Sequence, residues 1–212
     1  MHTSPSAWAV GSFSGISFDG TLRDLLGDFE SYIRVFNPAH DPTAPPGTDS
    51  RSWARAGTPA TVVTADTQWS DLQVDPVLDE PTMGDLDTDV AVRLASVLGR
   101  HTTTPDECAF LLWTGYAEVE SLDSAPVIRA GQRTDLAVFS GPIAAAVQPQ
   151  HGRRPMNWRP RDRAWALGND IYARSVYIGA DSATVRAIRD SPHLETALAS
   201  GSAILTPEDR RG

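Results

Sequence analysis

The segment Cys108–Thr114 (CAFLLWT) constrains the fold more than any other stretch, because it is almost continuously apolar. Such a run is typical of a strand that is buried on both faces of a sheet. Ahead of it, the apolar residues of Leu86–Leu98 recur at about 3.6-residue spacing, which predicts an amphipathic helix. We therefore expect this helix to pack its apolar face on a sheet that contains Phe110–Trp113.

The other predicted elements are short and follow no strict strand–helix–strand order. Alternating apolar residues predict strands at Ser31–Phe36, Leu136–Phe139, Ala164–Tyr172, Ser175–Gly179 and Ala203–Leu205. Helical spacing and capping residues predict helices at Thr21–Asp28, Ile143–Val147 and Asp181–Ile188. Gln148–Arg163 is predicted to be irregular, and His193–Ala199 to be a turn. This mixture favours the α+β class, with a mixed or antiparallel sheet and about three to five helices.

A chain of 212 residues suits a single domain. The serine- and glycine-rich residues 1–20 are predicted to form a loose N-terminal arm, 21–206 the globular α+β domain and 207–212 a frayed tail. No apolar run approaches about 18 residues, and the first residues do not resemble a secretory signal. We therefore expect a cytoplasmic protein without a membrane partner. The sequence gives no indication of its oligomeric state.

Charge is distributed unevenly along the chain, whose net charge is −9. Residues 64–125, the acidic segment, carry 13 acidic residues and 2 arginines, whereas residues 126–212 carry 12 arginines and 8 acidic residues. An acidic protein repels phosphates, which argues against nucleic acid as a partner. An acidic surface attracts a basic partner and speeds its association. The acidic segment therefore favours a basic protein partner.

The segment His151–Arg163 (HGRRPMNWRPRDR), the arginine segment, is the strongest candidate for a ligand site. Guanidinium groups bind phosphate or carboxylate through paired hydrogen bonds, and a tryptophan ring stacks on flat groups. The anion-binding candidates are Arg153, Arg154, Arg159, Arg161, Arg163 and Trp158. The alternative is that these arginines are internal counterions of the acidic segment. We favour this second interpretation, because it requires no unknown partner.

Catalytic and metal-binding motifs are missing. The five histidines are too far apart for a helical metal site, and a chain without lysine cannot carry a phosphate-binding loop of the Walker type. Asp85–Asp89 opens like a calcium loop, but Val90 and Ser96 stand where glycine and glutamate are required. Cys108 lies in an apolar run and is expected to be a buried, inert thiol. We expect no metal and no cofactor, and the sequence does not indicate an enzyme.

From Ser31 onward the sequence resembles an uncharacterised actinobacterial protein family. The segments that carry the resemblance are YIRVFNPAH at Tyr32–His40, Leu86–Thr102, FLLWTGY at Phe110–Tyr116, LAVFSGPI at Leu136–Ile143, WRPRDRAW at Trp158–Trp165 and VYIGADS at Val176–Ser182. The resemblance implies a single domain in a cytoplasmic bacterial protein. It implies no activity, cofactor or catalytic residue.

Two functions from different classes remain. The first is a non-enzymatic cytosolic binding protein, immunity-like or regulatory, with an acidic surface for a basic partner. The alternative is a small-molecule enzyme or sensor that holds an anionic ligand with the arginine segment 151–163. A contiguous exposed acidic face favours the first function. A concave pocket that holds two or more of these arginines with a carboxylate or histidine favours the second.

Overall fold

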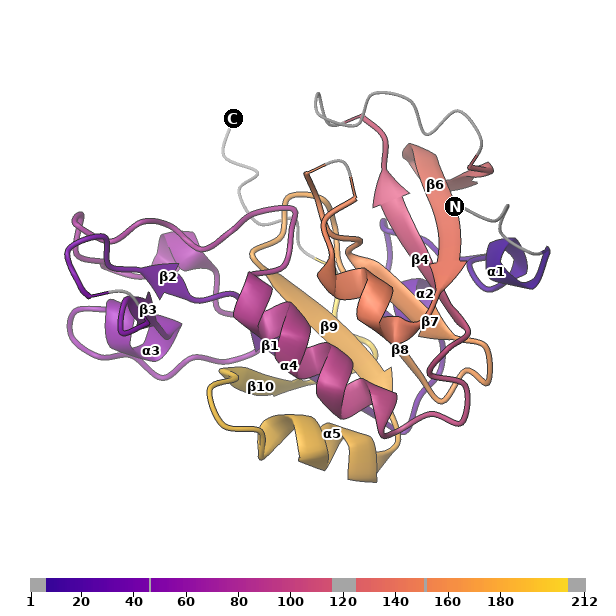
Figure 1. Cartoon of the computed structure of the whole chain (residues 1–212). Coiled ribbons are helices and arrows are strands. Elements are labelled where there is room, and N and C mark those ends of the chain that lie inside the picture. The colour runs from indigo at the N-terminus through magenta and orange to yellow at the C-terminus, as the bar shows by residue number, and fades with distance from the viewer. Residues whose placement is uncertain (1–6, 46, 116–124, 151, 206–212) are drawn as a thin grey trace.

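The computed structural model describes residues 7–45, 47–115, 125–150 and 152–205. These residues form one α+β domain built on an eight-stranded sheet, whose paired strands all run antiparallel in the order β10-β1-β9-β8-β7-β4-β6-β5 (Figure 1). A separate two-stranded sheet pairs β2 with β3. The predicted class, a single α+β domain with a largely antiparallel sheet, is confirmed.

The strands are short. They are β1 (Ser31–Phe36), β2 (Ala39–His40), β3 (Ser50–Arg51), β4 (Cys108–Trp113), β5 (Val127–Ala130), β6 (Arg133–Gly141), β7 (Asn157–Pro160), β8 (Trp165–Gly168), β9 (Ser175–Ala180) and β10 (Thr196–Ala199). The helices are α1 (Ala7–Gly11), α2 (Leu22–Leu26), α3 (Trp53–Ala56), α4 (Thr88–Gly99) and α5 (Ser182–Arg189), with 3-10 helices η1 (Trp69–Asp71) and η2 (Ile143–Val147). None of these described helices is long and apolar enough to span a bilayer.

Strand β4 organises the core of the sheet, as its apolar run predicts. It pairs with β6 on one side and β7 on the other, which places Phe110 opposite both Phe139 and Trp158. Leu94 of α4 is fully buried in the same apolar cluster as Phe110. The expected packing of this helix on this sheet is therefore confirmed.

The two faces of the sheet are covered by different elements. On β1, Ile33 and Val35 face the cluster that α4, α5 and η2 cover, whereas Tyr32 faces the cluster that includes residues of α1 and α2. Figure 1 shows α4 and α5 in front of the sheet and α2 behind it. Because side chains alternate along a strand, this division follows from the sequence pattern of β1.

A side lobe, residues 37–82, leaves the sheet where β1 ends and contains β2, β3, α3 and η1 (left in Figure 1). Its small core centres on Trp53, whose ring lies 4.7 Å from that of Phe36 and 5.4 Å from that of Trp69. Arg34 of β1, which is 1% exposed, donates to the carbonyls of Ala65 and Thr67 and so attaches the lobe to the sheet.

Four sequence expectations need correction. The predicted strand Ala203–Leu205 is not a strand, because within the described residues Ile204 makes only an isolated bridge to Thr21. Residues 7–20 are not a loose arm, because they contain α1 and bury Phe13 and Phe18 against the sheet. The supposedly irregular Gln148–Arg163 contains β7, and the expected turn at His193–Ala199 contains the edge strand β10. Residues 1–6 of the expected arm and the expected frayed tail 207–212 lie outside the described residues.

Candidate functional site

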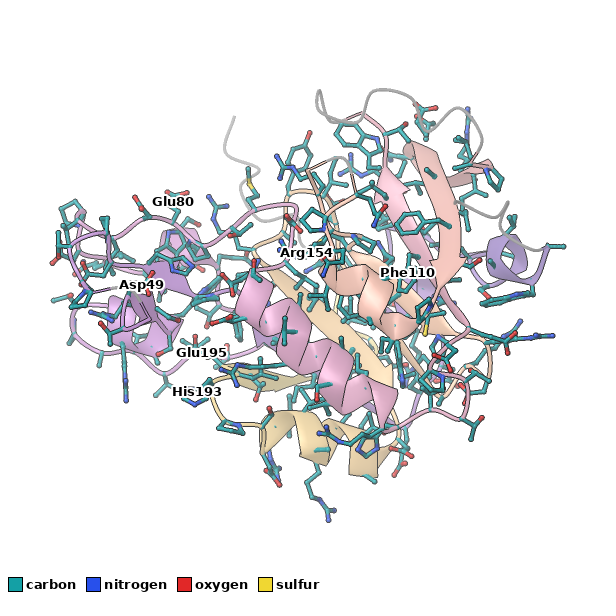
Figure 2. All side chains as sticks on the ribbon, in the orientation of Figure 1. Asp49, Glu80, Phe110, Arg154, His193 and Glu195 are labelled. Carbon is teal, nitrogen blue, oxygen red and sulfur yellow. The ribbon has the colours of Figure 1, made fainter. Side chains whose placement is uncertain are left out.

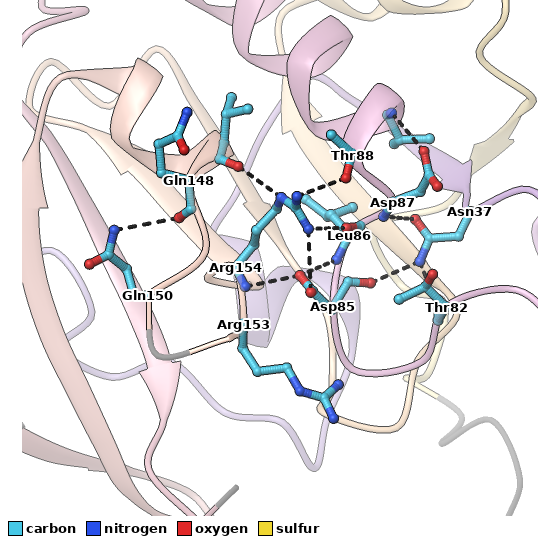
Figure 3. A network of polar contacts seen from close by, with 12 residues as sticks. Asn37, Thr82, Asp85, Leu86, Asp87, Thr88, Gln148, Gln150, Arg153 and Arg154 are labelled. Carbon is cyan, nitrogen blue, oxygen red and sulfur yellow. Dashed lines mark hydrogen bonds and ion pairs between the residues drawn. The ribbon is translucent and has the colours of Figure 1, made fainter. Parts of the chain in front are cut away.

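The arginines of the arginine segment do not gather in one place. Arg154 lies beside the start of α4, where its backbone N–H donates to Asp85 Oδ1 at 3.0 Å. Its guanidinium lies 3.5 Å from Asp85 Oδ2 and donates to Thr88 Oγ1 at 2.8 Å (Figure 3). The side chains of Arg154 and Asp85 are only 12% and 10% exposed. Arg154 is therefore an internal counterion of the acidic segment.

The surroundings of Asp85 form a structural junction. Burial raises the pKa of Asp85, although hydrogen bonds from the backbone of Arg154 and Leu86 act to lower it. Asn37, which follows β1, donates to the carbonyls of Thr82 and Asp85 and accepts from the N–H of Asp87. Figure 3 shows this network connecting the end of β1, the entry to α4 and the arginine segment.

The next two candidates, Trp158 and Arg159, lie on opposite faces of the sheet, because they are consecutive residues of β7. Trp158 is fully buried in the same cluster as Phe110 and donates through its ring N–H to the carbonyl of Pro155 at 2.6 Å. It is a core residue and not an accessible stacking surface. Arg159 emerges on the opposite face, where it donates to the carbonyls of Ser12 at 2.9 Å and Leu25 at 2.6 Å.

The turn between β7 and β8 holds three consecutive charged residues with three different environments. Arg161 forms an ion pair with Glu107 at 2.6 Å. Asp162 accepts from the backbone and hydroxyl of Thr103, which attaches the turn to the loop ahead of β4. Arg163 has no ion pair within the described part of the chain. Of the remaining candidates, Arg153 donates to the carbonyl of Met83 at 3.2 Å.

Two of the six candidates meet at a cavity of about 300 Å³. Arg159 and Arg163 line it from the β7–β8 hairpin, and Asp28 and Phe29 line it from the segment after α2. Burial, and then the neighbouring charge of Arg163, lower the pKa of the Arg159 guanidinium to about 10. With this pKa, Arg159 remains charged at neutral pH. The cavity thus brings two guanidinium groups and one carboxylate together.

The acidic segment reaches water mainly on the side lobe. Residues 37–82 carry seven acidic residues and two arginines. Asp66, Asp75 and Asp79 are exposed, as is Asp89 in the first turn of α4, and none of the four has an ion pair within the described ranges. Three acidic residues of the segment, Glu118, Glu120 and Asp123, lie outside the described residues.

A groove of about 520 Å³ separates the side lobe from the edge of the sheet. Its lining includes Arg55 from the lobe and His193 and Glu195 from the segment ahead of β10. Figure 2 shows His193 and Glu195 at this junction, with Asp49 and Glu80 out on the lobe. Burial raises the pKa of Glu195, and hydrogen bonds from the backbone of Ala54 and Trp53 act to lower it.

The arrangement around Glu195 is structural. One carboxylate oxygen accepts from the N–H of Trp53 at 2.6 Å and the other from Ala54 at 2.9 Å, so Glu195 caps α3. This contact joins the lobe to β10 across 142 residues of sequence. Because both oxygens are engaged, Glu195 is poorly placed to act as a general base on a ligand in the groove.

Cys108 is fully buried, and burial raises the pKa of its thiol to about 12. A thiol with this pKa is protonated at neutral pH and is a weak nucleophile. The expected buried thiol is confirmed. Within the described ranges, no three His, Cys, Asp or Glu side chains are grouped so that they could hold a metal ion.

Comparison of the chain with protein-family models, curated proteins and solved structures found no match. The function is therefore inferred from the charges and cavities described above. The resemblance to the actinobacterial family stays a prediction.

Sequence reasoning missed the residues that line the cavity together with Arg159 and Arg163. Asp28 and Phe29 line the cavity with Arg159, and the segment after α1 contributes Ser12 and Ser14. The sequence predicts a loose arm around Ser12 and Ser14, and a loose arm offers no fixed position for binding residues. The one usable signal was the spacing of Phe13 and Phe18, because aromatic residues in a serine-rich stretch indicate burial.

Proposed function

We propose that the protein is a non-enzymatic binding protein, immunity-like or regulatory, whose side lobe presents an acidic surface to a basic protein partner. The observation that carries the proposal is that Asp66, Asp75 and Asp79 are exposed and form no ion pair with any described residue. Arg51 of the lobe is already paired with Asp41 at 2.9 Å, so within the described residues it does not compensate these three carboxylates. We propose that this binding takes place in the cytoplasm, because a chain with a single cysteine forms no internal disulfide.

The contacts of the arginine segment support this proposal. Arg154 neutralises the buried Asp85, but within the described residues Arg159, Arg161 and Arg163 form no ion pair with the exposed acidic residues of the lobe. An uncompensated acidic surface costs stability through self-repulsion and attracts cationic partners. A basic partner would relieve that repulsion and associate faster at low ionic strength.

The titratable groups with shifted pKa values also favour binding over catalysis. Glu195 has both oxygens bound to the backbone of α3, and Cys108 is held as a neutral thiol in the core. Catalytic acids and nucleophiles need access to a substrate. Cys108 has no such access, and both carboxylate oxygens of Glu195 are already bound by the backbone of α3.

The test compares two variants with the same change in net charge. One carries Asp66→Asn, Asp75→Asn and Asp79→Asn on the lobe. Its matched control carries Asp106→Asn, Asp135→Asn and Asp190→Asn, which replace exposed acidic residues elsewhere on the surface. Binding of a nine-residue arginine peptide is measured by calorimetry at about 50 mM and about 300 mM salt.

We expect wild type and the control triple to bind the peptide, and the lobe triple to lose at least about tenfold in affinity at low salt. Higher salt should reduce the difference, because it screens exposed charges. Equal losses in the two triples would show that net charge alone attracts the peptide, and this result would contradict the proposal. A wild type that does not bind the peptide at low salt would contradict it as well.

A second candidate function, the binding of a small anion, is favoured by a separate observation. Two arginines of the arginine segment line one cavity together with a carboxylate, Asp28. This cavity adjoins the β7–β8 turn, where β9 ends and β1 begins, whereas the lobe leaves the sheet at the opposite end of β1. The two functions therefore involve different surfaces and are compatible.

A further inference from the structure

The charge of Arg159 is not balanced by a neighbouring carboxylate. Its guanidinium donates to the neutral carbonyls of Ser12 and Leu25 and lies 5.5 Å from the centre of the Phe13 ring. A guanidinium carries five N–H donors, so most of them are unused by the described residues. No nitrogen of Arg159 is both buried and unpaired. Its Nε, which has no partner in the described chain, is therefore open to solvent.

Arg163 is held beside this group by the geometry of the turn. Its backbone adopts a left-handed conformation, with φ of 58°, and its N–H donates to the carbonyl of Pro160 at 3.1 Å. The following residue, Ala164, donates its N–H to Asp162 Oδ1, while Asp162 Oδ2 accepts from Thr103. A left-handed residue other than glycine is strained and persists only where its surroundings enforce it. The turn thus fixes the backbone position of Arg163 at the cavity.

We propose that this cavity binds a small oxyanion, the phosphate or carboxylate group of a small molecule, between the guanidinium groups of Arg159 and Arg163. Two forked donors that meet at one cavity match an oxyanion with two or more acceptor oxygens. The cavity volume of about 300 Å³ is at the small end of ligand pockets, which favours a small molecule.

The carboxylate at the cavity does not replace such a ligand. Asp28 is already paired with Arg23 at 3.1 Å, on a side chain that is 86% exposed. The described lining therefore holds two guanidinium groups against one carboxylate that an outside arginine shares. An oxyanion would balance the excess positive charge, and it would reduce the repulsion between Arg159 and Arg163 that acts on the pKa of Arg159.

The experiment measures binding of inorganic phosphate and of succinate by calorimetry, at constant ionic strength, to wild type and two single variants. Arg163→Gln removes a cavity guanidinium that makes no hydrogen bond to the described residues, keeps the backbone bond to Pro160, and should leave the fold intact. Arg161→Gln is the matched control, because Arg161 lies two residues away and points to Glu107. Thermal melts of all three proteins confirm that they are folded.

We expect wild type to bind at least one probe with one-site saturation, Arg163→Gln to lose at least about tenfold in affinity, and Arg161→Gln to stay within about twofold. Phosphate binding without succinate binding would assign a phosphoryl ligand, and the reverse would assign a carboxylate. Saturation by neither probe up to about 10 mM would overturn the proposal. An equal loss in Arg161→Gln would also overturn it, because the attraction would then be unspecific.

Discussion

The arginine segment 151–163 and residues 64–89 of the acidic segment carry opposite charge at similar density, +4 over 13 residues and −8 over 26, and they fold in different ways. Two of the arginines reach inward, Arg154 to Asp85 and Arg159 to the carbonyl of Leu25. Apart from the buried Asp85, most of the aspartates face the solvent, and several bond only to their own neighbours. Asp75, for example, accepts from the N–H of Val77 two residues on.

The difference follows from the side chains. Arginine has a long stem and five donors, so it can bridge to carbonyls on distant elements. Aspartate is short and can only accept, which confines it to local turns, helix starts or water. A dense run of arginines in a sequence can therefore be structural, whereas a dense run of aspartates remains at the surface. Four predictions test this contrast, in order of decreasing effect.

The largest effect is expected for Arg154→Met. The variant leaves the buried carboxylate of Asp85 without its counterion, which should cost about 3–5 kcal/mol of unfolding free energy. Urea denaturation at pH 7 measures the loss. The loss should shrink at low pH, where Asp85 takes up a proton, and in the double variant with Asp85→Asn. A loss below about 0.5 kcal/mol is typical of a surface residue. It would contradict the contrast between arginines that bond inside the fold and aspartates that stay at the surface.

A smaller effect is expected for Arg159→Gln, which removes the hydrogen bonds to the carbonyls of Ser12 and Leu25. The cost should be about 1–3 kcal/mol, because two partly buried acceptors lose a charged donor. Hydrogen exchange should localise the change to the segments around α1 and α2. Arg161→Gln, measured alongside, should change stability by less than about 0.5 kcal/mol, since its ion pair with Glu107 is exposed.

The lobe triple Asp66→Asn, Asp75→Asn and Asp79→Asn should leave stability unchanged or raise it by up to about 1 kcal/mol at low salt. The exposed carboxylates repel one another, so replacing them with amides removes this repulsion from the folded state. Melts at about 20 mM and about 500 mM salt should show that salt stabilises wild type more than the triple. A triple that is clearly destabilised would show that the lobe's carboxylates have internal partners.

The smallest effect is a pH dependence at Glu195. Because burial raises its pKa above the ordinary value of 4.5, the folded state holds this proton more tightly than the unfolded state does. The stability of wild type relative to Glu195→Gln should therefore be greatest below pH 4.5 and decrease as the pH rises through the raised pKa. Urea melts at pH 4, 5.5 and 7 measure this difference. An increase with pH would mean that the bonds to α3 outweigh burial.

The elements that could be predicted are those with a strong local pattern. The apolar run at β4 and the 3.6-residue spacing of α4 both report burial directly, so their packing followed from the sequence. Strand β7 was missed because Trp158 alternates with Arg159, and arginine beside proline resembles a loop. Edge strand β10 was missed because its four residues are only partly buried, so they show no apolar pattern.

Only some of the residues that line the candidate cavity could be predicted from the sequence. The sequence identified Arg159 and Arg163 as anion-binding candidates, because guanidinium chemistry is a property of the residue. It could not separate them from Arg154, whose environment depends on a contact with Asp85, 69 residues away. Which arginines share a cavity is decided by pairing across the sheet, and no local pattern encodes that pairing.

The position of β1 has a consequence for synthesis on the ribosome. Its partners in β9 follow much later in the chain: Ser175 comes 139 positions after Phe36, and Ala180 comes 149 positions after Ser31. At about 5–20 residues per second, Ile33 and Val35 wait roughly 10–30 s for their neighbours. During that time an apolar strand with unpaired edges is exposed, a target for chaperones and a risk for aggregation. The interval before β9 emerges is thus the most vulnerable stage in the life of this protein.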